Sequence, residues 1–157
     1  MKISALILSA GYSSRMGKFK PLLPFGKTTV LHRVIGMFQK SGIRDIKVVT
    51  GYRGEETARE AERMNAQPLF NSLYDQGMFS SVQAGVQSLD SGTCAFFVLP
   101  VDIPLVQPET IVLLADSWQK TKPGVVYPVF KGKRGHPPPD FHGSPGTCPG
   151  LVRFPGA

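Results

Sequence analysis

The fold of this chain is decided by ISALILSAGYSSRMGKFK, residues 3–20 of a 157-residue sequence. Residues 3–9 form an apolar run without polar alternation, which is typical of a strand buried on both faces of a sheet. Residues 9–20 are rich in glycine, serine and basic side chains, and they predict a loop beyond that strand. Because the short apolar run leads directly into this turn, it fits a buried first strand better than a signal peptide.

Strand-like and helix-like segments alternate along the rest of the chain. Strands are expected at residues 3–9, 46–50, 67–70, 95–99 and 125–130, and helices at 30–39, 55–64, 79–89 and from Pro108 onward. This alternation predicts the α/β class, with a mostly parallel central sheet covered by helices on both faces. Ligands bind such sheets at the carboxyl ends of the strands, so the loops after residues 9 and 99 should share one rim.

Bulk composition narrows the classes of function. No apolar run approaches the roughly 20 residues that span a bilayer, so we expect a cytoplasmic protein that does not bind a membrane. The formal net charge of +7 favours anionic ligands. No basic cluster is interleaved with aromatic residues, so nucleic acid is not an expected partner. Cys94 and Cys148 have no metal-ligand spacing, and a structural zinc is not expected.

The loop at residues 9–20 carries groups that suit a triphosphate. Because it follows a buried strand, its backbone amides can point at an anion beyond the sheet. Gly11 and Gly17 allow close approach to phosphate. The side chains that offer hydroxyls or fixed positive charge are Ser13, Ser14, Arg15 and Lys20. An ordinary turn with solvated basic residues is the alternative.

Other phosphate-binding motifs fit this sequence poorly. A P-loop requires G-x-x-x-x-G-K-[ST]. Gly26-Lys27-Thr28 supplies its second half, but Pro21 stands where the first glycine is needed. The G-x-G-x-x-G fingerprint is absent after the first strand. These mismatches weaken the interpretations as a P-loop ATPase or a dehydrogenase.

Asp102 is a second candidate for chemistry. It lies in LPVDIP, residues 99–104, directly after a predicted buried strand and between two prolines. A carboxylate held at the rim suits Mg²⁺, which usually takes one or two carboxylates together with substrate phosphates. A turn or helix-capping aspartate is the alternative.

Several short motifs follow one another in a characteristic order. They are residues 8–17, Lys20, residues 22–24, residues 49–52, Asn71, Tyr74, Gly77, residues 80–82, residues 101–104 and residues 132–137. In combination they resemble the signature of the MobA-like nucleotidyltransferases, and within them the branch of molybdenum cofactor cytidylyltransferases. The resemblance runs from Lys2 to about Pro138. It implies a three-layer, Rossmann-like sandwich of the nucleotide-diphospho-sugar transferase type.

The resemblance also implies roles for individual residues. Ala10 and Gly11 would lie against the base and ribose, and Asp102 would ligate Mg²⁺ at the α-phosphate. Catalytic charge would come from Arg15 and Lys20. The expected nucleotide-binding residues are Ser9, Ala10, Gly11, Ser13, Ser14, Arg15, Lys20, Asn71 and Ser81. The guanylyl-transferring branch typically has two glycines at the Ala10-Gly11 position, so CTP is favoured over GTP.

The implied reaction moves CMP from CTP to molybdopterin, the molybdenum cofactor, and releases pyrophosphate. His136 would contact the phosphate or pterin of this acceptor, with a loop-stabilising histidine as the alternative. A molybdoenzyme or its chaperone is a candidate partner. Two other functions stay open. One is transfer to a sugar phosphate or another small phosphorylated acceptor, and the other is a non-catalytic nucleotide-binding or cofactor-binding module.

The apolar pattern stops after Gly135. Proline and glycine dominate residues 136–157, which predicts an irregular tail. With one C removed, codons for residues 138–143 can read Pro-Leu-Ile-Ser-Thr, so we hypothesise a frame break near Pro138. We therefore expect a transferase domain at residues 1–138 and a tail at 139–157. The resemblance implies a longer C-terminal part with a second metal-binding aspartate, so this copy is expected to be weakly active or inactive.

Overall fold

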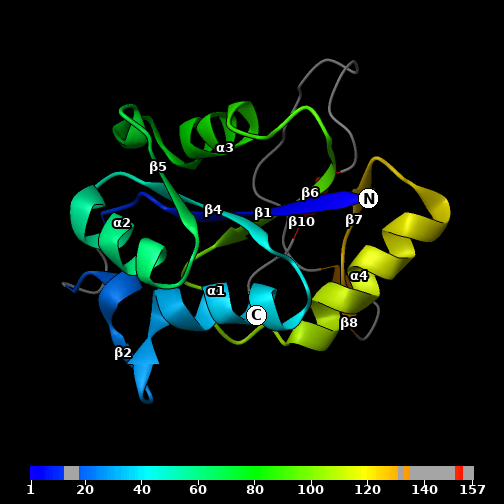
Figure 1. Cartoon of the computed structure of the whole chain (residues 1–157), viewed down its shortest axis with the longest axis horizontal. Helices are drawn as coiled ribbons and strands as arrows, with labels where there is room; N and C mark the ends of the chain where they lie inside the picture. The colour runs from blue at the N-terminus through cyan, green and yellow to red at the C-terminus, as the bar shows by residue number, and fades with distance from the viewer. Residues whose placement is uncertain (13–17, 131–132, 135–150, 154–157) are drawn as a thin grey trace.

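The computed structural model describes residues 1–12, 18–130, 133–134 and 151–153 (Figure 1). The strands are β1 Lys2–Ser9, β2 Pro24–Phe25, β3 Thr28–Thr29, β4 Asp45–Thr50, β5 Gln67–Phe70, β6 Thr93–Pro100, β7 Val125–Val126, β8 Val129–Phe130, β9 Lys133–Arg134 and β10 Leu151–Arg153. The α-helices are α1 Val30–Lys40, α2 Gly54–Arg63, α3 Met78–Gln87 and α4 Pro108–Thr121. Two short 3-10 helices are η2 Lys20–Leu22 and η3 Tyr74–Gln76.

The central sheet has six strands in the order β5-β4-β1-β6-β10-β7. Every neighbouring pair in it is parallel. Figure 1 shows α3 over one face of this sheet, with α1, α2 and α4 over the other. The predicted α/β class, a three-layer sandwich around a mostly parallel sheet, is therefore confirmed.

Strand β1 shows why both faces need a helical cover. Ala5 and Ile7 point into the core shared with α1 and α4, while Leu6 and Leu8 point into the core beneath α3. Side chains alternate between the two faces of a strand, so an uninterrupted apolar run supplies both cores at once. The buried first strand predicted at residues 3–9 is confirmed.

Helix α1 begins and ends where its sequence predicts. The side chain of Thr29 accepts a hydrogen bond from the backbone N–H of His32 at 3.2 Å, which caps the amino end. Ser41 and Gly42 follow its last residue, and Gly42 takes a left-handed conformation with φ of +86°. Helix α4 starts at Pro108, as the proline position predicts.

Two predictions near the carboxyl end were wrong. The strand expected at residues 125–130 is broken into β7 and β8, and β8 pairs with β9 in a separate antiparallel hairpin. Residues 136–157 were predicted to hold no strand, yet β10 lies between β6 and β7 in the main sheet. The domain boundary at residue 138 and the frame break stay predictions.

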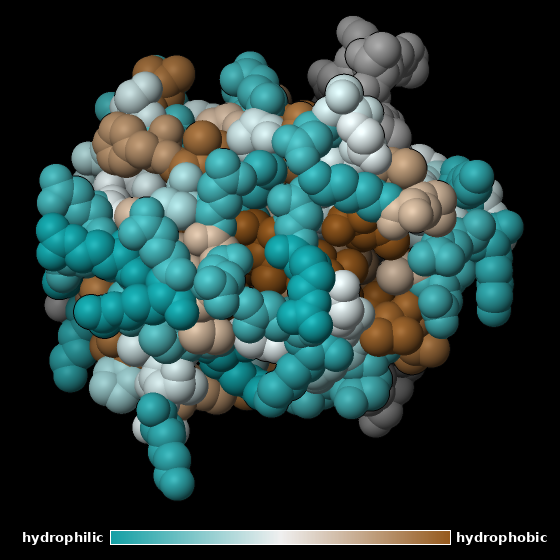
Figure 2. All heavy atoms as spheres, in the orientation of Figure 1, coloured by the Kyte–Doolittle hydropathy of each residue, from teal (hydrophilic) through white to brown (hydrophobic). Residues whose placement is uncertain are grey.

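The face of the molecule drawn in Figure 2 is mostly hydrophilic. Apolar side chains show in a hollow near its centre. A pocket of about 460 Å³ opens there, between the amino end of β1, the start of β4 and α4. This pocket lies at the amino ends of the strands, away from the rim where the predicted residues lie. No helix within the described ranges has both the length and the hydropathy that a bilayer span requires.

Candidate functional site

The carboxyl ends of four parallel strands meet at one rim of the sheet. Ser9 of β1 is in register with Thr50 of β4, and Thr50 is in register with Phe70 of β5. On the other side, Leu8 is in register with Pro100 of β6. The residues that follow these strand ends therefore share one edge, which is where ligands bind in open α/β sheets.

Two of the predicted catalytic residues meet at this rim. The Nζ atom of Lys20 lies 3.4 Å from Oδ2 of Asp102. The Lys20 side chain is 26% exposed and that of Asp102 is 48% exposed, so both groups remain accessible to a ligand. The two residues are 82 positions apart in sequence, with Lys20 at the start of η2 and Asp102 just after β6.

The predicted role of Asp102 as a metal ligand stays a prediction, because the structure shows only a partly exposed carboxylate. The described ranges hold no group of three or more histidine, cysteine or acidic side chains that could bind a metal by themselves. Mg²⁺ does not need such a cage when substrate phosphates complete its coordination. A single accessible carboxylate beside a lysine at a strand end fits a metal that arrives together with a triphosphate.

The segment from Ser9 to Gly11 is fixed by backbone contacts to both neighbouring strands. The carbonyl of Ala10 accepts from the N–H of Tyr52 at 3.1 Å, and the carbonyl of Leu8 accepts from Val101 at 3.0 Å. Ala10 is buried, whereas Gly11 is exposed at the rim. The Ser9 hydroxyl is buried without a hydrogen-bond partner among the described residues. Contact of these three residues with nucleotide stays a prediction.

Gly51 permits the close packing behind this segment. A Cβ atom on Gly51 would lie 2.5 Å from Cβ of Tyr74 and 2.8 Å from the carbonyl oxygen of Ala10. No real Cβ atom tolerates such distances to backbone, so a side chain here would displace the segment. Gly51 therefore sets the position of Ala10, a role that sequence inspection missed.

Asn71 and Ser81 form a buried polar network with each other. The Asn71 amide donates to Ser80 Oγ at 2.9 Å and to Ser81 Oγ at 3.1 Å. Its carbonyl oxygen accepts from the N–H of Leu73 at 3.0 Å. Both Asn71 and Ser81 are more than nine-tenths buried. The network ties the end of β5 to the start of α3, and direct contact with nucleotide stays a prediction for both residues.

The remaining predicted site residues are Ser13, Ser14, Arg15 and His136, which lie outside the described residues. Their roles as nucleotide or acceptor contacts stay predictions.

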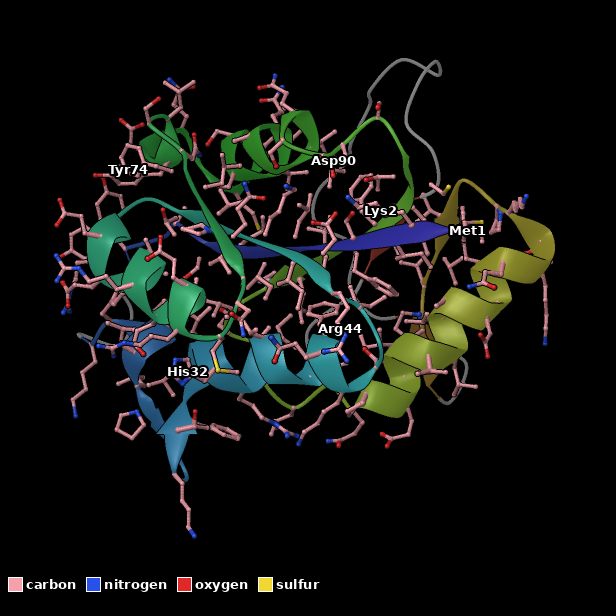
Figure 3. All side chains as sticks on the ribbon, in the orientation of Figure 1. Met1, Lys2, His32, Arg44, Tyr74 and Asp90 are labelled. Atoms are coloured by element: carbon pink, nitrogen blue, oxygen red, sulfur yellow. The ribbon has the colours of Figure 1, made fainter. Side chains whose placement is uncertain are left out.

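Aromatic side chains surround the same rim, and the sequence interpretation gave them no role. The Tyr12 ring lies 5.1 Å from the Tyr52 ring and 5.4 Å from the Tyr74 ring, between centroids. Hydrogen bonding to Tyr74 raises the pKa of Tyr12 above its ordinary value. Figure 3 shows Tyr74 on the side of the molecule away from Met1 and Lys2. The sequence did contain a signal for this cluster, since each of the three tyrosines lies within four positions after the end of a predicted strand.

Comparison with known proteins gives consistent matches. The chain is 35% identical over 136 residues to the molybdenum cofactor cytidylyltransferase of Escherichia coli strain K12, covering 86% of this chain and 68% of that protein. A nucleotidyl transferase from Methanothermobacter thermautotroptrophicus superposes with a TM-score of 0.68 at 27% identity. That match covers 73% of this chain and 57% of the archaeal chain, so this chain spans little more than half of it.

A more distant solved structure shares the fold. The 4-diphosphocytidyl-2C-methyl-D-erythritol synthase of Anaerococcus prevotii superposes with a TM-score of 0.63 at 21% identity, covering 77% of this chain and 52% of that one. The family model described as the MobA-like NTP transferase domain matches residues 5–156. The chain therefore belongs to the MobA-like NTP transferase domain family, a family of nucleotidyltransferases.

Proposed function

We propose that this chain transfers CMP from CTP to a phosphate oxygen of molybdopterin and releases pyrophosphate. The observation that carries the proposal is the Lys20–Asp102 pair, which lies at the same rim of the sheet as the Ala10-Gly11 segment. A cation for the triphosphate and a carboxylate for a metal are the groups that nucleotidyl transfer needs. The 35% identity to the Escherichia coli molybdenum cofactor cytidylyltransferase supports the choice of nucleotide and acceptor.

The proposed reaction is a single displacement at the α-phosphorus of CTP. An oxygen of the acceptor phosphate forms a bond to this phosphorus, and the bond to the bridging oxygen of the β-phosphate breaks. Pyrophosphate leaves with that electron pair. The attacking phosphate is already ionised, so no general base is required from the protein. Catalysis then depends on positioning and on stabilising the charge that develops on the leaving group.

Lys20 and Asp102 exchange partners when substrate binds. In the structure each neutralises the other across 3.4 Å. In the proposed complex Lys20 turns to the triphosphate, while Asp102 is the residue that would hold Mg²⁺. The metal would supply positive charge for the phosphate oxygens. Because both side chains are partly exposed, this exchange needs no rearrangement of the sheet.

Ala10 carries the proposed preference for CTP over GTP. It is buried at the end of β1, with its carbonyl fixed by the N–H of Tyr52. Its methyl group occupies the place where guanylyl-transferring relatives are expected to have glycine. We further propose that the product passes to a molybdoenzyme or its chaperone in the cytoplasm.

Release of pyrophosphate tests the proposal directly. Purified chain is incubated with Mg²⁺, CTP and molybdopterin, and pyrophosphate is measured with and without the metal. We expect slow release, as for a weakly active copy, that requires both the metal and the acceptor, with GTP a poorer donor. Release with a sugar phosphate in place of molybdopterin would replace the proposed acceptor. Binding of CTP without any release would favour a non-catalytic module and contradict the proposed reaction.

A further inference from the structure

Three of the four tyrosines in the chain converge at the rim of the sheet. Tyr12 follows β1, Tyr52 follows β4 and Tyr74 begins η3, and the ring of Tyr12 lies between the other two. The fourth tyrosine, Tyr127, lies between β7 and β8. Three segments that are far apart in the sequence thus each contribute one ring to a single cluster, which we call the tyrosine platform.

The tyrosine platform is supported from behind and open in front. The Phe19 ring is 8% exposed and packs edgewise against Tyr52, with centroids 5.9 Å apart. The guanidinium of Arg53 covers Phe19 at 4.8 Å from the ring centroid. By contrast, Tyr12 is 50% exposed and Tyr52 is 39% exposed. Rings that pack against neighbouring rings and remain partly exposed are suited to stacking against a flat ligand.

The tyrosine platform continues into the phosphate site. Phe19, which supports Tyr52, immediately precedes Lys20, and Lys20 pairs with Asp102 at 3.4 Å. The backbone of Tyr52 also donates to the carbonyl of Ala10. Aromatic rings and phosphate-binding groups therefore follow one another along the same strand ends. A nucleoside triphosphate has the matching arrangement, with a flat base at one end and its anionic groups at the other.

We propose that Tyr12 and Tyr52 stack against the base of the nucleoside triphosphate, with Tyr74 holding Tyr12 in place. This inference rests on the proposed function, because it assumes that the rim binds a nucleotide. Stacking on aromatic rings tolerates any base, since every base has a π-face. The tyrosine platform therefore provides affinity for the base, while the choice between CTP and GTP depends on the Ala10-Gly11 segment.

Two ligands separate base stacking from phosphate binding. Titration calorimetry with Mg²⁺ compares CTP with inorganic tripolyphosphate, which lacks the base and ribose. In Tyr12→Leu and Tyr52→Leu we expect the CTP affinity to fall about ten-fold, as for loss of one stacked base. Tripolyphosphate affinity should not change, and the ratio of CTP to GTP affinity should stay as in the wild type. Tyr12→Phe and Tyr52→Phe should restore CTP affinity, and Tyr127→Leu is the matched control.

Each other result counts against the inference. An equal loss for CTP and tripolyphosphate would mean that the rings only fix the loops. Unchanged CTP affinity in both leucine variants would contradict the proposed stacking of these rings on the base. A wild-type chain that binds neither ligand would contradict the proposed function itself and the inference with it. If a leucine variant does not fold, NMR on the wild type decides, because stacking requires magnetisation transfer from tyrosine ring protons to H5 and H6 of cytosine.

Discussion

At the scale of single residues, the pairing of Lys20 with Asp102 gives the sharpest expectation. Lys20→Ala removes the cation proposed to bind the triphosphate, and Asp102→Ala removes the proposed metal ligand. Each change should lower the rate of pyrophosphate release by about 10²–10³-fold, as does loss of one preorganised charge-stabilising group. Lys18→Ala is the matched control, because Lys18 is an exposed lysine two positions earlier. Near-normal release by either rim variant would refute its assigned role.

Gly51 provides a test of how the nucleotide segment is positioned. In Gly51→Ala the new Cβ would meet both Tyr74 and the carbonyl oxygen of Ala10 at less than 3 Å. We expect a loss of about 1–3 kcal/mol in the free energy of unfolding, as is typical of overpacking, measured by urea denaturation. CTP binding should weaken as well, because Ala10 is displaced. Gly92→Ala is the control, since a Cβ there meets nothing within 4 Å. Equal stability of the two variants would contradict the packing argument.

At the scale of elements, one glycine lets α3 pack directly against side chains of the sheet. A Cβ on Gly85 would lie 3.0 Å from Cδ1 of Leu6 and 3.3 Å from Cγ2 of Val49. Gly85→Val should therefore destabilise the fold by about 1–3 kcal/mol, read from the urea midpoint. Gln83→Val introduces the same side chain on the exposed face of α3, where we expect a small effect. If both variants unfold at the same urea concentration, close approach of α3 is not the cause.

The amino end of β1 is joined to the α3–β6 connection by an ion pair with a defined pH dependence. A hydrogen bond from Lys2 lowers the pKa of Asp90 below its ordinary value of 3.8. A carboxylate with a lowered pKa contributes stability above that ordinary value and loses it as the pH falls through the lowered one. The urea midpoint of Asp90→Asn should therefore lie slightly below that of the wild type at pH 7.

The difference between the two urea midpoints should shrink towards pH 3. It should also shrink in high salt, because both groups are exposed and screened. A difference that persists unchanged at pH 3 would assign the effect to something other than the charge of Asp90.

At the scale of the whole molecule, long apolar runs made the main sheet predictable. Residues 3–9 and 95–99 are recognisable as buried strands because their side chains pack into both hydrophobic cores. The two strands run parallel, so the residues that follow them, Asp102 among them, lie at the same rim as Lys20. The tyrosine platform was not predicted, because it depends on which loops come into contact. Gly51 was missed for the same reason. Strand β10 has only three residues among prolines and glycines, which is too short for any period to show.

Strand β10 gives the last prediction, since it tests whether residues 1–138 are a complete folding unit. It is hydrogen-bonded between β6 and β7, so its removal leaves β7 without a neighbour in the described part of the sheet. The Tm of a chain of residues 1–138 should be lower than that of the full chain. The expected shift is about 2–4 °C for each kcal/mol of unfolding free energy lost with the strand pairing. Val152→Pro should lower the Tm in the same direction, because proline cannot donate within a central strand. Identical melting of all three chains would instead support an irregular tail after residue 138.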